Sequence, residues 1–157
     1  MVWGACSRKG KLPLLFIERG VKINQDYYIS RVLNGHMLEH VEALYGEEYY
    51  CFQQDSAPSH KAKRTQEWCA NNLTDFLSPE DWPSSSPDLN PLDFFAWGYM
   101  LCKIGSTRGM TLATFKNALI KIWDEMPMEM VRASCDNFFK RLKMVVKAKG
   151  ERFECYN

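Results

Sequence analysis

The spacing of apolar positions in the first third of the chain predicts two short strands followed by a long helix. Two apolar runs, residues 2–7 and 14–18, flank the turn-rich segment SRKGKLP and are typical of a β-hairpin. Asn24 can cap a helix that we expect to run from about Gln25 to Tyr45. The apolar positions of that helix share one face and predict a buried stripe: Ile29, Val32, Leu33, Met37, Val41 and Leu44.

Shorter segments of mixed type fill the middle of the chain. The aromatic run 49–54 and the apolar run 73–77 predict a third and a fourth strand. Between them we expect a helix over about residues 59–72. A loop rich in serine and proline follows over residues 78–91.

Three helices are predicted for the rest of the chain. The first starts near Pro91 and runs to about Ile104, where the glycine-containing segment 105–109 ends it, and Thr111 can cap the second. The last two helices each have an apolar face: Phe115, Leu119, Ile122 and Met126 in one, and Val131, Cys135, Phe138, Leu142 and Val145 in the other. Because strands precede and alternate with helices, we predict an α/β fold.

Length and composition fit one globular domain. The 157 residues are 46% hydrophobic and 25% charged, which is ordinary for a globular protein. No apolar run reaches the roughly 18 residues that a membrane span needs. The N-terminus lacks a signal-peptide layout and the cysteines are scattered without a CxxC pair, so we expect an intracellular protein with reduced, mostly buried thiols.

Charge is distributed unevenly, although the net charge is only +1. Residues 132–152 carry seven basic and two acidic residues. A basic helix in that segment could contact phosphates. A solvated helix face explains the same pattern, and we favour that interpretation.

Two aspartates stand in rigid, proline-containing segments, FQQDSAPSH and SPDLNPLDFFAWG. Asp55 follows the predicted strand 49–54, where a carboxylate of an open α/β sheet points into the ligand crevice, although a helix cap before Pro58 explains it equally well. Asp93 lies in the first turn of a helix that Asn90 can cap, and the helix dipole favours an acid there without any ligand.

If these carboxylates converge, they form a hard-oxygen site that suits Mg²⁺ or Mn²⁺. Two such ions can clamp the attacking and leaving oxygens of a phosphodiester displacement. This chemistry normally requires at least one more acid. Asp55 and Asp93 therefore predict part of a metal site.

Three segments, in this order, resemble the catalytic domain of mariner-type transposases: VWGACSRKGKLPLLFIERG, FQQDSAPSH and SPDLNPLDFFAWG. The resemblance covers residue 2 to about residue 104. It implies a three-acid DDE/D site on a ribonuclease-H-like fold, with Mg²⁺ or Mn²⁺ as cofactor. By position, Asp55 matches the second catalytic and metal-binding acid and Asp93 the third, whereas Asp88 matches a loop position that shapes the site and His60 a supporting histidine.

The resemblance also implies a first acid, on a central strand before the segment that is similar to residues 2–7. Because the chain begins within that later segment, we expect a ribonuclease-H-like mixed sheet flanked by helices but lacking its first strand. The expected organisation is a truncated catalytic core over residues 1–104 and a C-terminal helical extension of the same domain over 105–157. We expect binding of Mg²⁺ or Mn²⁺ by two acids to be weak and the chain to be inactive alone.

The function implied is therefore that of a fragment of a DNA transposase catalytic domain, which cleaves and transfers DNA strands in transposition and integration. The alternative is a non-enzymatic, transposon-derived protein that binds nucleic acid or dimerises. The implied partners are DNA and either a second copy or a full-length transposase, without a membrane, and the implied location is the nucleus.

Basic side chains follow the second acid directly in the sequence. Lys61, Lys63 and Arg64 come after His60 and, together with it, could contact DNA phosphates. A solvated helix face explains these basic residues equally well.

Other polar residues offer weaker alternatives. Glu18 or Asp26 could replace the lost acid, although strand-end and helix-start roles suit them better. His36 and His40 have a helical spacing that can bind zinc, but the sequence offers no third ligand with evident spacing.

Overall fold

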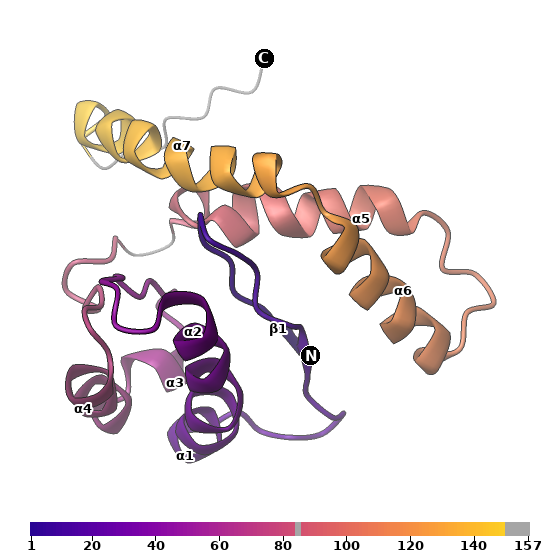
Figure 1. Cartoon of the computed structure of the whole chain (residues 1–157), viewed down its shortest axis with the longest axis horizontal. Helices are drawn as coiled ribbons and strands as arrows, with labels where there is room; N and C mark the ends of the chain where they lie inside the picture. Colours follow the sequence, from indigo (N-terminus) through magenta and orange to yellow (C-terminus); the bar gives the residue numbers. More distant parts are fainter. Residues whose placement is uncertain (84–85, 150–157) are drawn as a thin grey trace. The chain divides into compact units, whose positions relative to one another are not determined.

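The computed structural model describes residues 1–83 and 86–149 (Figure 1). The chain divides into two compact units, the first made of Met1–Trp3 with Leu15–Ser86 and the second of Gly4–Leu14 with the chain from Pro87 onward. The predicted boundary near residue 104 stays a prediction. Arg152 of the basic segment and Cys155 lie outside the described residues.

The predicted hairpin is present, with shorter strands than expected. Strand β1 (Val2–Trp3) pairs antiparallel with β2 (Leu15–Phe16), so that Val2 faces Phe16 and Trp3 faces Leu15. Nearer the turn, Cys6 and Lys11 form an isolated bridge. The hairpin therefore starts and ends in the first unit, while its turn belongs to the second unit.

A continuous helical segment fills residues 25–45, as the sequence predicts. It consists of α1 (Gln25–Tyr27), a π-helical stretch η1 (Tyr28–Met37) and α2 (Leu38–Tyr45). The Asn24 carboxamide oxygen caps it by accepting the backbone N–H of Tyr27 at 2.9 Å. The predicted buried stripe is confirmed in part, because Val32, Leu33 and Met37 are buried. Ile29, Val41 and Leu44 are only half-buried, and Tyr28, which the prediction left out, is buried.

The predicted mixed sheet is wrong in its extent. Among the described residues, the only sheet is the two-stranded β1–β2 pair. Residues 49–54 and 73–77 meet only at one parallel bridge between Phe52 and Phe76. Two backbone hydrogen bonds support it, from the Phe52 N–H to the Asp75 carbonyl at 2.8 Å and from the Leu77 N–H to the Phe52 carbonyl at 2.9 Å. An isolated parallel pair is marginal in water, because it gains cooperative pairing only when further strands flank it.

The helix predicted over residues 59–72 is broken into two. The first part is α3 (Pro58–Lys61) and the second is α4 (Lys63–Asn72). Ala62 separates them with an extended backbone, ψ 136°. The buried Thr65 hydroxyl donates to the Ser59 carbonyl at 2.8 Å across this break, which stabilises the bend.

The described part of the second unit is helical beyond the hairpin turn. A short 3₁₀ turn, η2 (Pro87–Leu89), precedes a helix that begins as a π-turn, η3 (Leu92–Ala96), and continues as α5 (Trp97–Ile104). Two longer helices follow, α6 (Leu112–Glu125) and α7 (Met128–Lys147). The predicted cap of α6 is confirmed, since the Thr111 hydroxyl accepts the Thr114 N–H at 3.1 Å.

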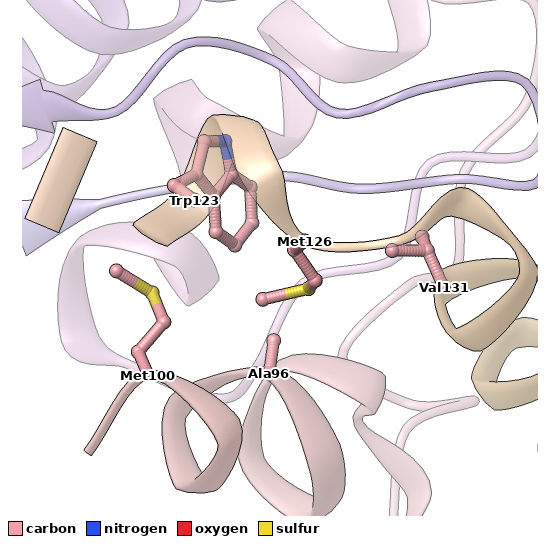
Figure 2. Close-up of a cluster of buried hydrophobic side chains, with 5 residues drawn as sticks. All are labelled: Ala96, Met100, Trp123, Met126 and Val131. Carbon is pink, nitrogen blue, oxygen red and sulfur yellow. The ribbon is translucent and has the colours of Figure 1, made fainter. Parts of the chain in front are cut away.

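The core of the second unit lies where α5, α6 and α7 contribute apolar side chains (Figure 2). Its fully buried members are Ala96, Met100, Trp123, Met126 and Val131. Trp97 stacks on Trp123 with ring centroids 6.1 Å apart. The Trp123 indole N–H donates to the Leu12 carbonyl at 2.8 Å, which attaches the hairpin turn to this core.

Burial of the thiols differs from the expectation. The five described cysteines are free thiols, and of these only Cys69 is buried while Cys51 and Cys102 are exposed. Helices long and apolar enough to cross a membrane are absent from the part of the chain that the structure describes.

Candidate functional site

Asp55 lies between the Phe52 bridge and the first turn of α3. Its Oδ1 atom accepts the backbone N–H of Ala57 at 2.9 Å. The same oxygen lies 2.7 Å from Nδ1 of His60, which α3 provides. Pro58 opens α3 at its first position, so the short segment after Asp55 folds back and brings His60 to the carboxylate.

A buried tyrosine supports His60 from the long helical segment. The Tyr28 and His60 rings lie 4.3 Å apart at an angle of 33°. The Tyr28 hydroxyl donates to Oε1 of Gln54 at 3.0 Å, next to Asp55 in the chain. Tyr28 is 1% exposed, so its position is fixed by packing, and it holds both the histidine ring and the segment that carries Asp55.

These contacts favour the ionised form of Asp55. The hydrogen bond from His60 lowers the pKa of the Asp55 carboxyl below its ordinary value. Partial burial opposes that change, whereas the Ala57 N–H and the charge of a protonated His60 reinforce it. Asp55 is therefore ionised at neutral pH and available as an anionic ligand.

The Asp55 carboxylate by itself fits a hard divalent cation. Its side chain is 52% exposed, and Oδ2 has no hydrogen-bond partner among the described residues. A carboxylate with one oxygen held by the protein and the other open to solvent is a suitable ligand for Mg²⁺ or Mn²⁺. Groups of three or more His, Cys, Asp or Glu side chains that could hold a metal ion are absent from residues 1–83 and 86–149.

Asp93 is exposed in the first turn of the helix that begins at η3. Asn90 caps this helix start, because its side-chain oxygen accepts the Leu92 N–H at 3.1 Å and its carbonyl accepts the Asp93 N–H at 2.9 Å. The capping predicted from NPLD is confirmed. Asp93 belongs to the second unit and Asp55 to the first, and their convergence at one metal site stays a prediction.

The loop residue Asp88 lies in η2, just before the Asp93 helix. Its backbone carbonyl accepts a hydrogen bond from Arg141 Nη1 at 3.1 Å. The Asp88 segment is thus connected to α7, a contact between residues far apart in the sequence.

The basic residues after His60 are on the surface of the first unit. Lys61 is exposed at the end of α3. Lys63 forms an ion pair with Glu67 at 3.8 Å, and Arg64 pairs with Asp26. Exposed pairs of this kind contribute little stability, so their cations can exchange an acid for a phosphate at small cost.

Asp26 is one of the two acids that could replace the first catalytic acid. It lies in the first turn of α1 and forms an ion pair with Arg64. Glu18 is exposed after β2. The Nδ1 atom of His40 lies 2.7 Å from the His36 carbonyl oxygen, so this nitrogen contacts the helix backbone. None of these contacts points to a ligand.

Two residues that shape these surroundings were not singled out by the sequence reasoning. Tyr28 lies on the same helical face as Val32, so a stripe extended by one turn would have included it. Arg141 contacts Asp88 across 53 residues, and no local pattern signals such a contact.

Comparison with known proteins finds transposases among the relatives of this chain. It is 30% identical over 150 residues to the transposase of the Caenorhabditis briggsae element Tcb2, covering 96% of this chain and 52% of that protein. It is 28% identical over 152 residues to the Tc3 transposase of Caenorhabditis elegans, covering 96% of this chain and 44% of that protein. No protein-family model matches the chain.

Solved structures agree with this result. The catalytic domain of Mos1 transposase, in a structure with Raltegravir and Mn, matches with a TM-score of 0.82 at 21% identity, covering 98% of this chain and 76% of that one. A structure of the same domain with Raltegravir and Mg matches with a TM-score of 0.83 at 20% identity, covering 98% and 75%. Mos1 transposase in a paired-end complex with the left transposon end matches with a TM-score of 0.83 at 21% identity, covering 98% and 44%.

The chain is homologous to the catalytic domain of Tc1/mariner transposases over nearly its whole length. It shares the ribonuclease-H-like fold of the Mos1 catalytic domain, although its described sheet has only two strands. The chain spans about half the length of the curated relatives that it matches.

Proposed function

We propose that Asp55 and Asp93 are the second and third acids of a DDE/D site for metal-dependent cleavage and transfer of DNA strands. The geometry around Asp55 carries this proposal: one oxygen is fixed by Ala57 and His60, and the side chain is half exposed. Homology to transposase catalytic domains supports the assignment, and Mos1 structures that hold Mn or Mg support the choice of metal.

In this proposal each residue has a distinct part. Asp55 and Asp93 would hold the divalent ions, whose charge would stabilise the negative charge that develops on the oxygens of the phosphodiester. His60 holds the Asp55 carboxylate in one orientation, and Tyr28 supports His60 from the core. The attacking group would be water in the first step and a 3′-hydroxyl in the second.

We further propose that the 157-residue chain alone does not complete this reaction. A DDE/D site uses three acids, and Asp55 and Asp93 account for two of them. Asp26 already pairs with Arg64, and Glu18 is an exposed side chain beyond β2. Fixed coordination geometry is needed for metal catalysis, and neither acid has a supporting contact of the kind that Asp55 has.

The proposed partner is DNA, with a second copy or a full-length transposase as the protein partner and the nucleus as the location. The paired-end complex of Mos1 with a transposon end supports DNA as the partner. A second candidate function, a nucleic-acid-binding protein without catalysis, is favoured by the exposed basic side chains of α7: Arg132, Lys140, Lys143 and Lys147.

Nicking of supercoiled plasmid DNA in the presence of Mn²⁺ tests the proposed loss of activity. We expect no nicking above background from the chain alone, while DNA binding measured by fluorescence anisotropy weakens as salt rises. Nicking that Asp55→Asn abolishes, and that the matched surface variant Glu67→Gln leaves intact, would contradict the proposed inactivity and establish Asp55 as a catalytic ligand.

Titration with Mn²⁺, followed by the electron paramagnetic resonance signal of the free ion, tests the two ligands. Asp55→Asn and Asp93→Asn should each lower the amount of bound Mn²⁺. Glu129→Gln is the matched control for Asp93, because Glu129 is also an acid in the first turn of a helix. Equal binding by all variants would remove Asp55 and Asp93 as ligands.

A further inference from the structure

One arginine of α7 contacts both segments that lead into the Asp93 helix. Arg141 Nη1 donates to the Asp88 carbonyl at 3.1 Å. The guanidinium carbon of the same side chain lies 4.1 Å from the centre of the Phe94 ring. Phe94 follows Asp93 directly, and Asp88 lies in the 3₁₀ turn before it, so a single half-buried side chain spans the whole helix start.

The hydrogen bonds that Asn90 makes at this helix start are local in the sequence. Asn90 caps it through Leu92, Asp93 and Phe94, and its own N–H donates to the Pro87 carbonyl at 3.1 Å. These bonds define the shape of the turn, while Leu92, Phe95 and Ala96 pack it against the apolar core of the second unit. Arg141 supplies a connection to a helix 53 residues away in the chain.

The first turn of this helix is also of an unusual kind. The Trp97 N–H bonds to the Leu92 carbonyl, five residues earlier, so residues Leu92–Ala96 form a π-turn. Such turns are rare and often found at functional sites, and they persist where tertiary contacts over-determine the backbone. A guanidinium held 4.1 Å from the centre of an aromatic ring is such a contact, because it restrains the rotation of the helix about its own axis.

We propose that Arg141 is a positioning residue for Asp93, acting through Phe94 and the Asp88 carbonyl. This inference rests on the proposed function, in which Asp93 holds a metal ion. Arg141 orients the first turn of the helix, and that turn orients the Asp93 carboxylate. Lysine cannot replace it, because an ammonium group lacks both the planar face for stacking and the fork of N–H donors.

Amide hydrogen exchange of the ¹⁵N-labelled chain tests the positioning role. In Arg141→Met we expect the Asp93 and Phe94 amides to exchange roughly tenfold faster, given the stacking and hydrogen bond that are lost. Amides of α6 should keep their protection, and Arg141→Lys should not rescue the effect. Lys140→Met, an exposed neighbour on the same helix, is the matched control and should exchange like the parent chain.

Unchanged exchange at Asp93 and Phe94 in Arg141→Met would overturn the positioning role. An equal loss of protection in α6 would overturn it as well, because it would show a general stabilising role. Line broadening of the Asp93 amide by added Mn²⁺ supplies the second readout, and we expect Arg141→Met to need several-fold more Mn²⁺ for the same broadening. Equal Mn²⁺ dependence in both proteins would again overturn the positioning role.

The two proposals fail in different ways. If Mn²⁺ does not broaden the Asp93 amide in the parent chain, the metal role of Asp93 is wrong and positioning of a metal ligand falls with it. Faster exchange in Arg141→Met would still be seen in that case. If Mn²⁺ broadens Asp93 in both proteins alike, the metal role stands and Arg141 does not position it.

Discussion

At the scale of single residues, Asp55 does not cap α3 as one of the two sequence interpretations proposed, because the N-cap position of α3 is Ala57, without a side-chain hydrogen bond. It accepts the Ala57 N–H, as a residue that stabilises the start of a turn does. It also presents a half-exposed, ionised carboxylate, as a metal ligand does. The turn contact and the proposed ligand role do not compete, because the turn contact uses Oδ1 and leaves Oδ2 for a ligand.

The Asp55–His60 contact predicts a dependence of stability on pH. Because the folded-state pKa of Asp55 lies below its ordinary value of 3.8, the ionised group stabilises the fold fully above that value. The contribution is lost as pH falls through the lower, folded-state pKa. The difference in free energy of unfolding between the parent chain and Asp55→Asn should thus be largest near neutral pH and shrink below about pH 4.

Urea denaturation at a series of pH values measures this difference. Glu67→Gln is a suitable control, since Glu67 is 58% exposed and its partner Lys63 is 3.8 Å away. We expect its effect to be small at every pH. A difference for Asp55→Asn that stays constant down to pH 3 would show that the His60 contact does not stabilise the ionised carboxylate.

At the scale of secondary-structure elements, the helices were predictable and the sheet was not. Apolar stripes and capping residues are local signals, and Asn24, Asn90 and Thr111 all cap where the sequence places them. Strand pairing depends on neighbouring strands that are distant in the chain, and local sequence patterns do not identify them. The runs 49–54 and 73–77 have strand composition, yet they form one bridge because no further strand flanks them in the described structure.

Departures from ideal helices were also beyond the sequence. The π-helical stretch Tyr28–Met37 lies in a segment with an ordinary helical stripe. No glycine near Ala62 signals the helix break there in the sequence. The buried hydrogen bond from the Thr65 hydroxyl to the Ser59 carbonyl stabilises this break. Tertiary contacts thus decide the local backbone where intrinsic propensity is neutral.

The Asn24 cap predicts a measurable stability loss. Asn24→Ala removes the acceptor for the Tyr27 N–H and should lower the free energy of unfolding by about 1 kcal/mol. Asn24→Asp should restore most of it, because aspartate caps equally well. Urea denaturation followed by circular dichroism measures both, with the exposed Asn71→Ala in α4 as the control. Equal stability of Asn24→Ala and the parent chain would show that the cap is not formed in solution.

At the scale of the whole molecule, family and fold were predictable from three motifs because homologous sequences keep their order. Comparison with relatives confirms the transposase homology, and the match to the Mos1 catalytic domain confirms a ribonuclease-H-like fold, whereas the predicted mixed sheet is reduced to two strands in the described residues. The division of the hairpin between two compact units was not predictable. The division depends on contacts between the hairpin turn and α6, which lie more than 100 residues apart in the chain. Lys11 and Leu12 of the turn both bond to Trp123 of α6.

Lys11 makes this attachment specific. Its ammonium group donates to three backbone carbonyls at the end of α6, those of Trp123 at 2.5 Å, Asp124 at 3.2 Å and Met126 at 2.7 Å. The last carbonyls of a helix have no partner within it, and a cation there also complements the helix dipole. Lys11 therefore closes the C-terminal end of α6 next to the buried core residues Trp123 and Met126.

Lys11→Met keeps the length of the side chain and removes its hydrogen bonds. We expect it to lower the free energy of unfolding by roughly 1–3 kcal/mol, because the α6 carbonyls lose a charged donor in a partly buried place. Lys143→Met, an exposed lysine of α7, should change stability by less than about 0.5 kcal/mol. Urea denaturation monitored by tryptophan fluorescence compares the two variants, and equal effects would show that the hairpin turn does not stabilise the helical unit through Lys11.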